Sequence, residues 1–209
     1  MVDPERTYVI ASTERSGSTM LADAFIATGV LGAPHEILQS AALGAFGHRF
    51  GSPRPTVRAH AARTVRWLRF APDWRATLRM RPDSMTSYVE AIQHHRTTPN
   101  GVFGLKAHWG QVASLREFAI DPFELFAWRR AVLLTREDHV RQAISFHRAR
   151  RSGRWRAELA LESTGPDEYD AEDIAWAIGR IEASEAGWRE ELAREAEVAG
   201  VEVLELTYE

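Results

Sequence analysis

The sequence predicts an α/β fold built on a parallel central sheet. Short apolar runs of strand length alternate along the chain with longer stretches of helical periodicity, which is the pattern of strand–helix–strand units. The first apolar run passes through a loop of small residues directly into a helix, within residues 8–20. With 209 residues, of which 44% are hydrophobic, the chain is expected to form a single domain covering residues 1–209.

Composition excludes several classes of function. The net charge of −3 gives no general attraction to nucleic acid or to membranes. The absence of cysteine excludes disulfides, thiolate catalysis and cysteine-based metal sites. No apolar run approaches the roughly 18 residues of a membrane span, and the acidic, polar N-terminus does not resemble a signal peptide. We therefore expect a cytoplasmic protein.

The segment at residues 8–20 is the centre of the prediction. Residues 8–11 are continuously apolar, as in a buried parallel strand. Residues 13–17 are too polar and turn-prone to continue the strand, and residues 18–28 have helical spacing, with Gly29 as the C-cap. This arrangement predicts an anion cradle, because backbone N–H groups converge at a helix N-terminus that carries partial positive charge.

The loop differs from that of nucleoside triphosphatases, which requires G-x-x-x-x-G-K-[ST]. After Gly17 the lysine position is occupied by Ser18, and the position of the first glycine is occupied by Ser12. The positive charge lies inside the loop, at Arg15. Triphosphate hydrolysis is therefore not expected, whereas a single phosphate or sulfate at the 5′ end of a nucleotide suits the loop. The alternative is an ordinary strand–helix turn with a serine N-cap.

Further elements follow along the chain. Strands are predicted at residues 102–107, 130–135 and 201–206. Helices are predicted at residues 56–70, from 83 or 84 to 92, at 111–118, at 121–128, from about 137, and at 171–199. Residues 44–55, rich in glycine and proline, are predicted to form a loop. The chain stops directly after the fourth strand, which is predicted to belong to the core, so we expect a truncated C-terminus.

Charge is unevenly distributed along the chain. Residues 48–81 contain nine arginines and a single acid, Asp73, whereas acids dominate from residue 158 onward. Both segments are interpreted as solvated helix faces, with the alternative that the basic one borders a site for an anionic ligand. Basic charge is otherwise almost entirely arginine, and Lys106 is the only lysine. Because Lys106 ends the second predicted strand, it is expected to point toward the edge of the sheet that carries the loop.

A second candidate phosphate site follows the third predicted strand. Arg136 lies at the carboxyl end of that strand, where α/β sheets place ligand contacts, and Ser145 follows nine residues later in a helix. A guanidinium and a hydroxyl can hold one phosphate from two sides. The alternative is that Arg136 forms a surface ion pair with Glu137 or Asp138 and that Ser145 has no special role.

Taken together, these motifs resemble bacterial sulfotransferases of the trehalose 2-sulfotransferase family. The resemblance covers most of the chain and rests on five strings in order. They are A-S-T-E-R-S-G-S-T-M-L at residues 11–21, T-G-V-L-G-A-P-H-E at 28–36, T-P-N-G-V-F-G-L-K at 98–106, L-T-R-E-D-H-V-R-Q-A-I-S-F at 134–146, and E-A-G-W-R at 185–189.

The resemblance implies a P-loop-like sulfotransferase fold, with a central, mostly parallel sheet flanked by helices. It implies 3′-phosphoadenosine-5′-phosphosulfate (PAPS) as donor, a carbohydrate hydroxyl on a trehalose-like sugar or glycolipid as acceptor, no required metal, and a homodimer. The residues implied to hold the 5′-phosphosulfate are Arg15, Ser16, Gly17, Ser18 and Thr19. Those implied to hold the 3′-phosphate are Arg136 and Ser145.

By the same resemblance Glu36 is the general base. The chain is expected to return near the loop after the first helix, bringing Glu36 beside Arg15 and Ser16, although an exposed helix-start carboxylate is the alternative. His35 is a substitute base, and Lys106 is expected to contact the sulfuryl oxygens or the acceptor.

Two tryptophans near these motifs are also candidates for ligand contacts. Trp109 and Trp155 are assigned either to stacking on a sugar or adenine, or to packing.

Three other functions remain open at this stage. A small-molecule kinase would need the missing lysine of the loop and would bind ATP with Mg²⁺. A non-catalytic nucleotide-binding module would bind 3′,5′-bisphosphoadenosine and tolerate the loss of Glu36. A sulfotransferase acting on a non-sugar acceptor is the third, because the resemblance is weakest at residues 40–97, where the acceptor is expected.

Overall fold

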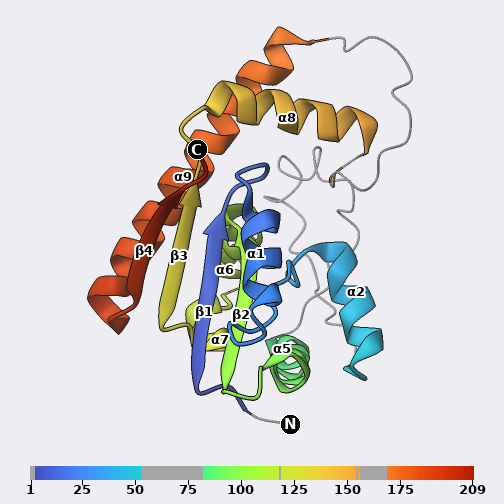
Figure 1. Cartoon of the computed structure of the whole chain (residues 1–209), viewed down its shortest axis with the longest axis vertical. Helices are drawn as coiled ribbons and strands as arrows, with labels where there is room; N and C mark the ends of the chain where they lie inside the picture. The colour runs from blue at the N-terminus through green and yellow to red at the C-terminus, as the bar shows by residue number, and fades with distance from the viewer. Residues whose placement is uncertain (1–2, 53–81, 118, 154, 156–168) are drawn as a thin grey trace.

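The computed structural model describes residues 3–52, 82–117, 119–153, 155 and 169–209 (Figure 1). In this part of the chain, four parallel strands form one sheet in the order β2-β1-β3-β4. The strands are β1 (Arg6–Ser12), β2 (Val102–His108), β3 (Arg130–Thr135) and β4 (Glu202–Thr207). The α/β class and the four strands predicted from the sequence are confirmed.

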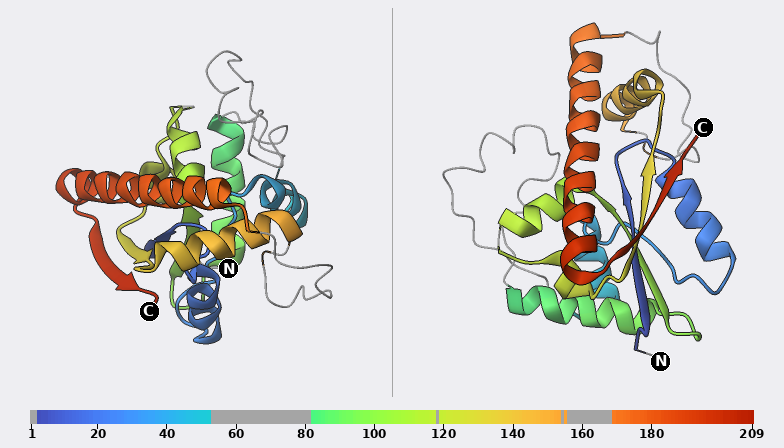
Figure 2. Two further views of the ribbon diagram at one scale, coloured as in Figure 1. Left: turned by 90° about the horizontal axis from the view of Figure 1, so that it is seen from above. Right: turned by 90° about the vertical axis from the view of Figure 1, so that its left-hand side faces the viewer.

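Helices cover both faces of the sheet and its upper edge (Figures 1 and 2). They are α1 (Ser18–Ala27), α2 (Ser40–Arg49), α5 (Pro82–Arg96), α6 (Trp109–Glu117), α7 (Pro122–Phe126), α8 (His139–Ser152) and α9 (Ala171–Ala199). The period of two along β1 separates two cores. Val9 and Ala11 face the larger core with α5, α6, α7 and α9, whereas Tyr8 and Ile10 face α1.

The strand order brings four chain segments to one edge of the sheet. The chain passes from β1 to β2 on one side and then crosses to β3 on the other, so the connections diverge at the carboxyl end of β1. Ligands of open α/β sheets bind at such a switch point. The loop at residues 13–17 follows β1 at this edge, His108 ends β2, Arg136 follows β3 and Tyr208 follows β4.

β4 is an exposed edge strand, so the expectation that it belongs to the core was wrong. It pairs only with β3 in the described sheet, and Leu204 is 57% exposed. Beside it, a groove of about 480 Å³ lies on the α1 side of the sheet, lined in part by Phe25, Val132 and Val203. The buried residue of this segment is Val201, which precedes the strand.

The predicted loop at residues 44–55 was also wrong at its start, because α2 is a helix up to Arg49. Leu43, Phe46 and Phe50 recur at helical spacing and bury one side of it. Phe50 stacks on His95 of α5, with ring centroids 4.7 Å apart. The tertiary contact therefore overrides the low helix propensity of the glycines.

Other predicted elements vary in outcome. The predicted helix at residues 171–199 coincides with α9, and the helix predicted from about residue 137 begins at His139, with Asp138 as its N-cap. The helix predicted at residues 56–70 and most of the basic segment at 48–81 lie outside the described residues. Across the ranges that the structure describes, no helix combines the length and apolar character needed to cross a membrane.

Candidate active site

The loop between β1 and α1 has the backbone geometry of an anion site. Arg15 and Gly17 both have left-handed conformations, with φ of 63° and 85°, on either side of Ser16. Such alternation turns successive N–H groups toward one concavity. Gly17 is the N-cap of α1 and forms no side-chain cap hydrogen bond, and the first turn carries no acid. The N-terminus of α1 is therefore suited to an external anion.

Position 17 requires glycine for a second reason besides its positive φ. A Cβ atom there would overlap the ring of Tyr208 from the end of β4. Tyr208 in turn donates its backbone N–H to the carbonyl of Thr135, at 3.0 Å. The loop is thus packed directly against the residue that follows β4.

Arg15 and Ser145, both predicted from the sequence, are in contact. Arg15 Nε donates to Ser145 Oγ at 2.9 Å, and Nη1 donates to the carbonyl of Trp155 at 2.7 Å. Burial, and after it the positive charge of Arg136, lower the pKa of Arg15. The structure therefore brings Arg15, Arg136 and Ser145 into one electrostatic neighbourhood at the loop.

Arg136 holds a carboxylate. Its Nε lies 3.2 Å from Glu209 Oε1, and its guanidinium lies 5.0 Å from the centre of the Tyr208 ring. The Glu209 carboxylate also accepts the backbone N–H groups of Glu137, at 2.9 Å, and Asp138, at 3.4 Å. The backbone bond from Glu137 is the main cause that lowers the pKa of Glu209. These donors form a second place where the fold accommodates negative charge.

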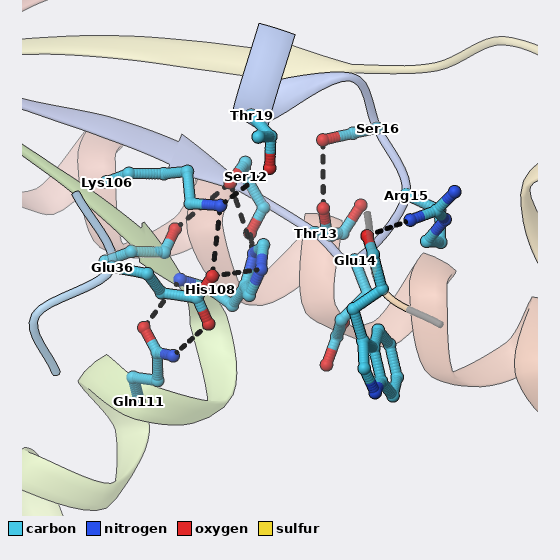
Figure 3. Close-up of polar contacts among 12 residues, drawn as sticks. Ser12, Thr13, Glu14, Arg15, Ser16, Thr19, Glu36, Lys106, His108 and Gln111 are labelled. Carbon is cyan, nitrogen blue, oxygen red and sulfur yellow. Dashed lines mark hydrogen bonds and ion pairs between the residues drawn. The ribbon is translucent and has the colours of Figure 1, made fainter. Parts of the chain in front are cut away.

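Glu36 lies in a polar cluster with residues of β2 and α6 (Figure 3). Its Oε2 is 3.0 Å from Lys106 Nζ and 3.4 Å from His108 Nε2, and its Oε1 accepts from Gln111 Nε2 at 2.8 Å. Lys106 Nζ also donates to Thr19 Oγ1 of α1, at 3.2 Å. Glu36 therefore connects to the start of α1 through Lys106. Its contacts are with these residues rather than with Arg15 and Ser16 as expected.

The charges of this cluster shift one another's pKa. Burial alone would raise the pKa of Glu36, but His108 and Lys106 outweigh it and hold that pKa well below its usual value. Burial alone would lower the pKa of His108, but Glu36 and Glu14 outweigh it and raise that pKa. Glu36 and His108 thus stabilise each other's charged forms.

The loop is anchored from behind by α8 and α9. Gln142 of α8 donates to Thr13 Oγ1 at 2.8 Å and to the carbonyl of Glu14 at 2.7 Å. Arg180 of α9 forms an ion pair with Glu14 at 2.6 Å. These contacts hold the loop by its own polar groups, from the side of α8 and α9.

His108 and Gln111 were missed by the sequence analysis. The second strand was predicted to end at residue 107, whereas β2 extends through His108. The available signal was the period of two, which puts His108 on the same face as Lys106. His35, the suggested substitute base, lies with its ring near that of Phe46, at 6.3 Å.

The two candidate tryptophans have different surroundings. Trp109 packs edge-to-face on Trp188, with ring centroids 5.6 Å apart, which agrees with the packing alternative. Trp155 is 42% exposed and meets Phe146 edge-to-face at 5.8 Å.

Comparison with known proteins identifies the family. The family model described as Stf0 sulphotransferase matches residues 7–209. The chain belongs to the Stf0 sulphotransferase family. It is 31% identical over 211 residues to the trehalose 2-sulfotransferase of Mycolicibacterium smegmatis, an alignment that covers 90% of this chain and 73% of the relative.

A second relative supports the same assignment. The chain is 29% identical over 218 residues to the trehalose 2-sulfotransferase of Mycobacterium tuberculosis, covering 97% of this chain and 77% of the relative. The resemblance and the sulfotransferase fold expected from the sequence are therefore confirmed, and the protein is a sulfotransferase. The roles of individual residues in this Stf0 family member stay predictions.

Proposed function

We propose that the protein transfers a sulfuryl group from PAPS to a hydroxyl of a trehalose-like sugar or of a glycolipid that contains one. One observation carries this proposal. Lys106 Nζ contacts both Thr19 at the start of α1, at 3.2 Å, and Glu36, at 3.0 Å. An anion cradle and a candidate base thus both contact one buried cation, and this proximity favours in-line transfer between a donor and a hydroxyl.

The proposed donor contacts come from the loop and from the end of β3. Backbone N–H groups of residues 15–19 and the Arg15 guanidinium would hold the 5′-phosphosulfate. Arg136 and Ser145 would hold the 3′-phosphate. The carboxylate bound at Arg136 supports this role for Arg136, and Ser145 bonds to Arg15, whose pKa is lowered by burial and then by the charge of Arg136. Charge-assisted bonds of this kind are about twice as strong as neutral ones.

The proposed transfer asks the protein mainly for position and charge. Glu36 accepts the proton of the sugar hydroxyl while the oxygen of that hydroxyl bonds to sulfur. The bond from sulfur to the 5′-phosphate oxygen breaks, and its electron pair leaves on the phosphate. Arg15 and the loop N–H groups stabilise the leaving phosphate, and Lys106 stabilises the sulfuryl oxygens in the transition state.

The acceptor is assigned by likeness. Both relatives described above are named trehalose 2-sulfotransferase, which favours trehalose or a derivative of it. A sulfotransferase with a non-sugar acceptor is the second candidate. A kinase is disfavoured because Ser18 occupies the position of the lysine that binds triphosphates.

Calorimetric titration with 3′,5′-bisphosphoadenosine tests the donor site. Loss of the Arg136 contact in Arg136→Ala should weaken binding at least about tenfold, since hydrogen bonds to charged groups contribute about 1.5–3 kcal/mol. Arg130→Ala is the matched control, because Arg130 lies at the opposite end of β3 and forms a similar ion pair with Glu202, at 2.8 Å. Its affinity should stay at the wild-type value.

Two further measurements separate the alternatives. ATP with Mg²⁺ should bind more weakly than the bisphosphate, and tighter ATP binding would favour a kinase. Transfer of labelled sulfate from PAPS to trehalose should be lost in Glu36→Gln with bisphosphate binding retained. Equal affinity for the bisphosphate in the wild type and in Arg136→Ala would overturn the proposed donor site.

A further inference from the structure

The hydrogen bonds of His108 fix which of its ring nitrogens titrates. Ser12 Oγ donates to the carbonyl of Ala107, at 3.3 Å, so its oxygen is left to accept from His108 Nδ1, at 3.2 Å. The other partner of Nδ1 is the carbonyl of Ser12, at 3.4 Å, which Trp188 Nε1 holds in place at 3.0 Å. Because both partners are acceptors, Nδ1 carries a hydrogen in the neutral and in the charged ring.

Nε2 is therefore the atom that gains and loses a proton, and it faces Glu36. Nε2 lies 3.4 Å from Oε2, the same oxygen that pairs with Lys106 at 3.0 Å. The other oxygen of Glu36 accepts from Gln111 at 2.8 Å, and Gln111 is itself held by the backbone N–H of His108 at 3.1 Å. Lys106 and Gln111 donate to the two carboxylate oxygens in either state of the ring. Protonation of Nε2 adds a further donor and a second positive charge beside Oε2, so Glu36 is then at its weakest as a proton acceptor.

Charged groups from several parts of the fold surround His108. Lys106 lies on the same strand, β2, whereas Glu36 lies in the segment between α1 and α2 and Glu14 in the loop after β1. Arg180 of α9 binds Glu14 and neutralises part of its charge. Burial and the charge of Lys106 oppose the charged ring, but the two acids outweigh them, so the pKa of His108 is raised.

We propose that His108 controls Glu36: the charged ring blocks proton transfer to the carboxylate, and the neutral ring takes over the proton that Glu36 receives. The proton leaves the sugar hydroxyl for Glu36 Oε2 and passes to Nε2 of His108. The sugar oxygen bonds to sulfur as the bond to the 5′-phosphate breaks. This inference rests on the proposed function and adds a positioning residue that acts through Glu36.

The inference predicts where activity is lost on acidification. A general-base carboxylate acting alone loses kcat/KM near or below its usual pKa of about 4.3. Control by His108 instead moves the loss to a pH above about 6.5, the usual value of histidine, because the pKa of His108 is raised. Below that point kcat/KM should fall about tenfold per pH unit, as expected for one required deprotonation.

The pH profile of His108→Gln tests this. Glutamine can still donate to Glu36 but does not titrate, so the loss of kcat/KM between pH 8 and pH 6 should disappear, with a lower plateau. His147→Gln is the matched control. His147 is also buried, with 3% of its side chain exposed, and it bonds to Asp173 at 2.6 Å, so its substitution should leave the shape of the profile unchanged.

A readout without turnover separates this inference from the proposed function. The ring titration of His108 is followed by NMR in the free wild-type protein and in Glu36→Gln, where the pKa of His108 should fall because its main acidic partner is gone. An unchanged titration overturns the inference, as does transfer whose acidic limb persists in His108→Gln. A shifted titration without sulfate transfer to any sugar supports the coupling of His108 to Glu36 and overturns the proposed function.

Discussion

The N-termini of α1 and α9 satisfy their backbone donors in opposite ways. Asp170 caps α9 by accepting the N–H groups of Glu172, at 2.9 Å, and Asp173, at 3.1 Å, and both residues add negative charge to the first turn. α1 begins at Ser18 after its N-cap Gly17, with no side-chain cap bond and no acid in its first turn. The N-terminal backbone donors of α9 are capped by its own side chain, whereas the N-terminus of α1, with its partial positive charge, has no side-chain cap.

This difference shows what the fold reserves for a ligand. The N-cap of α1 is Gly17, which lacks a side-chain cap bond and is less stabilising than a capping side chain by roughly a few tenths of a kcal/mol. The left-handed conformation of Arg15 adds a cost of about 1–2 kcal/mol. Cations gather around the uncapped end instead, since Lys106 contacts Thr19 and Arg15 lies near Arg136. This arrangement is the one expected from the proposed role of the loop in binding the sulfate donor.

Gly17→Ala should have the largest effect on ligand binding at the N-terminus of α1. The new Cβ would overlap the Tyr208 ring and force a left-handed alanine, so the loop must deform. Affinity for 3′,5′-bisphosphoadenosine should fall about 5- to 150-fold, corresponding to the roughly 1–3 kcal/mol typical of overpacking. Calorimetry measures the affinity and thermal unfolding measures the stability.

Gly200→Ala is the matched control for Gly17→Ala. Gly200 has a φ of 66°, close to that of many left-handed glycines, and no heavy atom would lie within 4 Å of its Cβ. It should lose about 1–2 kcal/mol of stability from its backbone conformation and bind the bisphosphate normally. Equal binding losses in both variants would mean that general destabilisation, rather than the loop, causes the effect.

Thr19→Val sharpens the comparison by testing the link from α1 to Glu36. Valine keeps the shape but removes the oxygen that accepts from Lys106 at 3.2 Å. Because the Lys106 ammonium then loses Thr19 and keeps Glu36, kcat for sulfate transfer should fall about tenfold, at the low end of the roughly 1.5–3 kcal/mol for charged hydrogen bonds. Thr19→Ser keeps the hydroxyl and should stay within about threefold of wild type; equal rates in both variants would remove Thr19 from the site.

The sequence was sufficient for most of the sheet and for the loop. Each buried strand is a local apolar run, and the order of strand, small residues and helix at residues 8–20 needs no distant contact to be recognised. Arg136 and Lys106 were placed correctly at the carboxyl edge of the sheet for a similar reason, since each lies at or near the end of an apolar strand. Their roles in the site stay predictions. Confirmation of the Stf0 family shows that these local signals were specific in combination.

What the sequence could not supply depends on contacts between distant segments. The bond from Gln111 to Glu36 joins residues 75 positions apart, and no local pattern marks it. The ion pair of Arg136 with Glu209 likewise depends on β3 and β4 being neighbours. α2 was missed because its glycines predicted a loop, while the rings of Phe46 and Phe50 acquire their partners only when α5 packs beside them.

Asp170→Ala tests the other side of the comparison and should have the smallest effect. Loss of the cap should reduce the free energy of unfolding by about 1 kcal/mol and the melting temperature by about 2–4 °C. Bisphosphate affinity should not change, because the cap belongs to the structure of α9 alone. Asp170→Ser, which keeps a capping oxygen, should recover most of the stability. If Asp170→Ala also weakened bisphosphate binding, the start of α9 would be coupled to the loop through Arg180 and Glu14, and the division between a self-capped helix and a ligand-capped one would not hold.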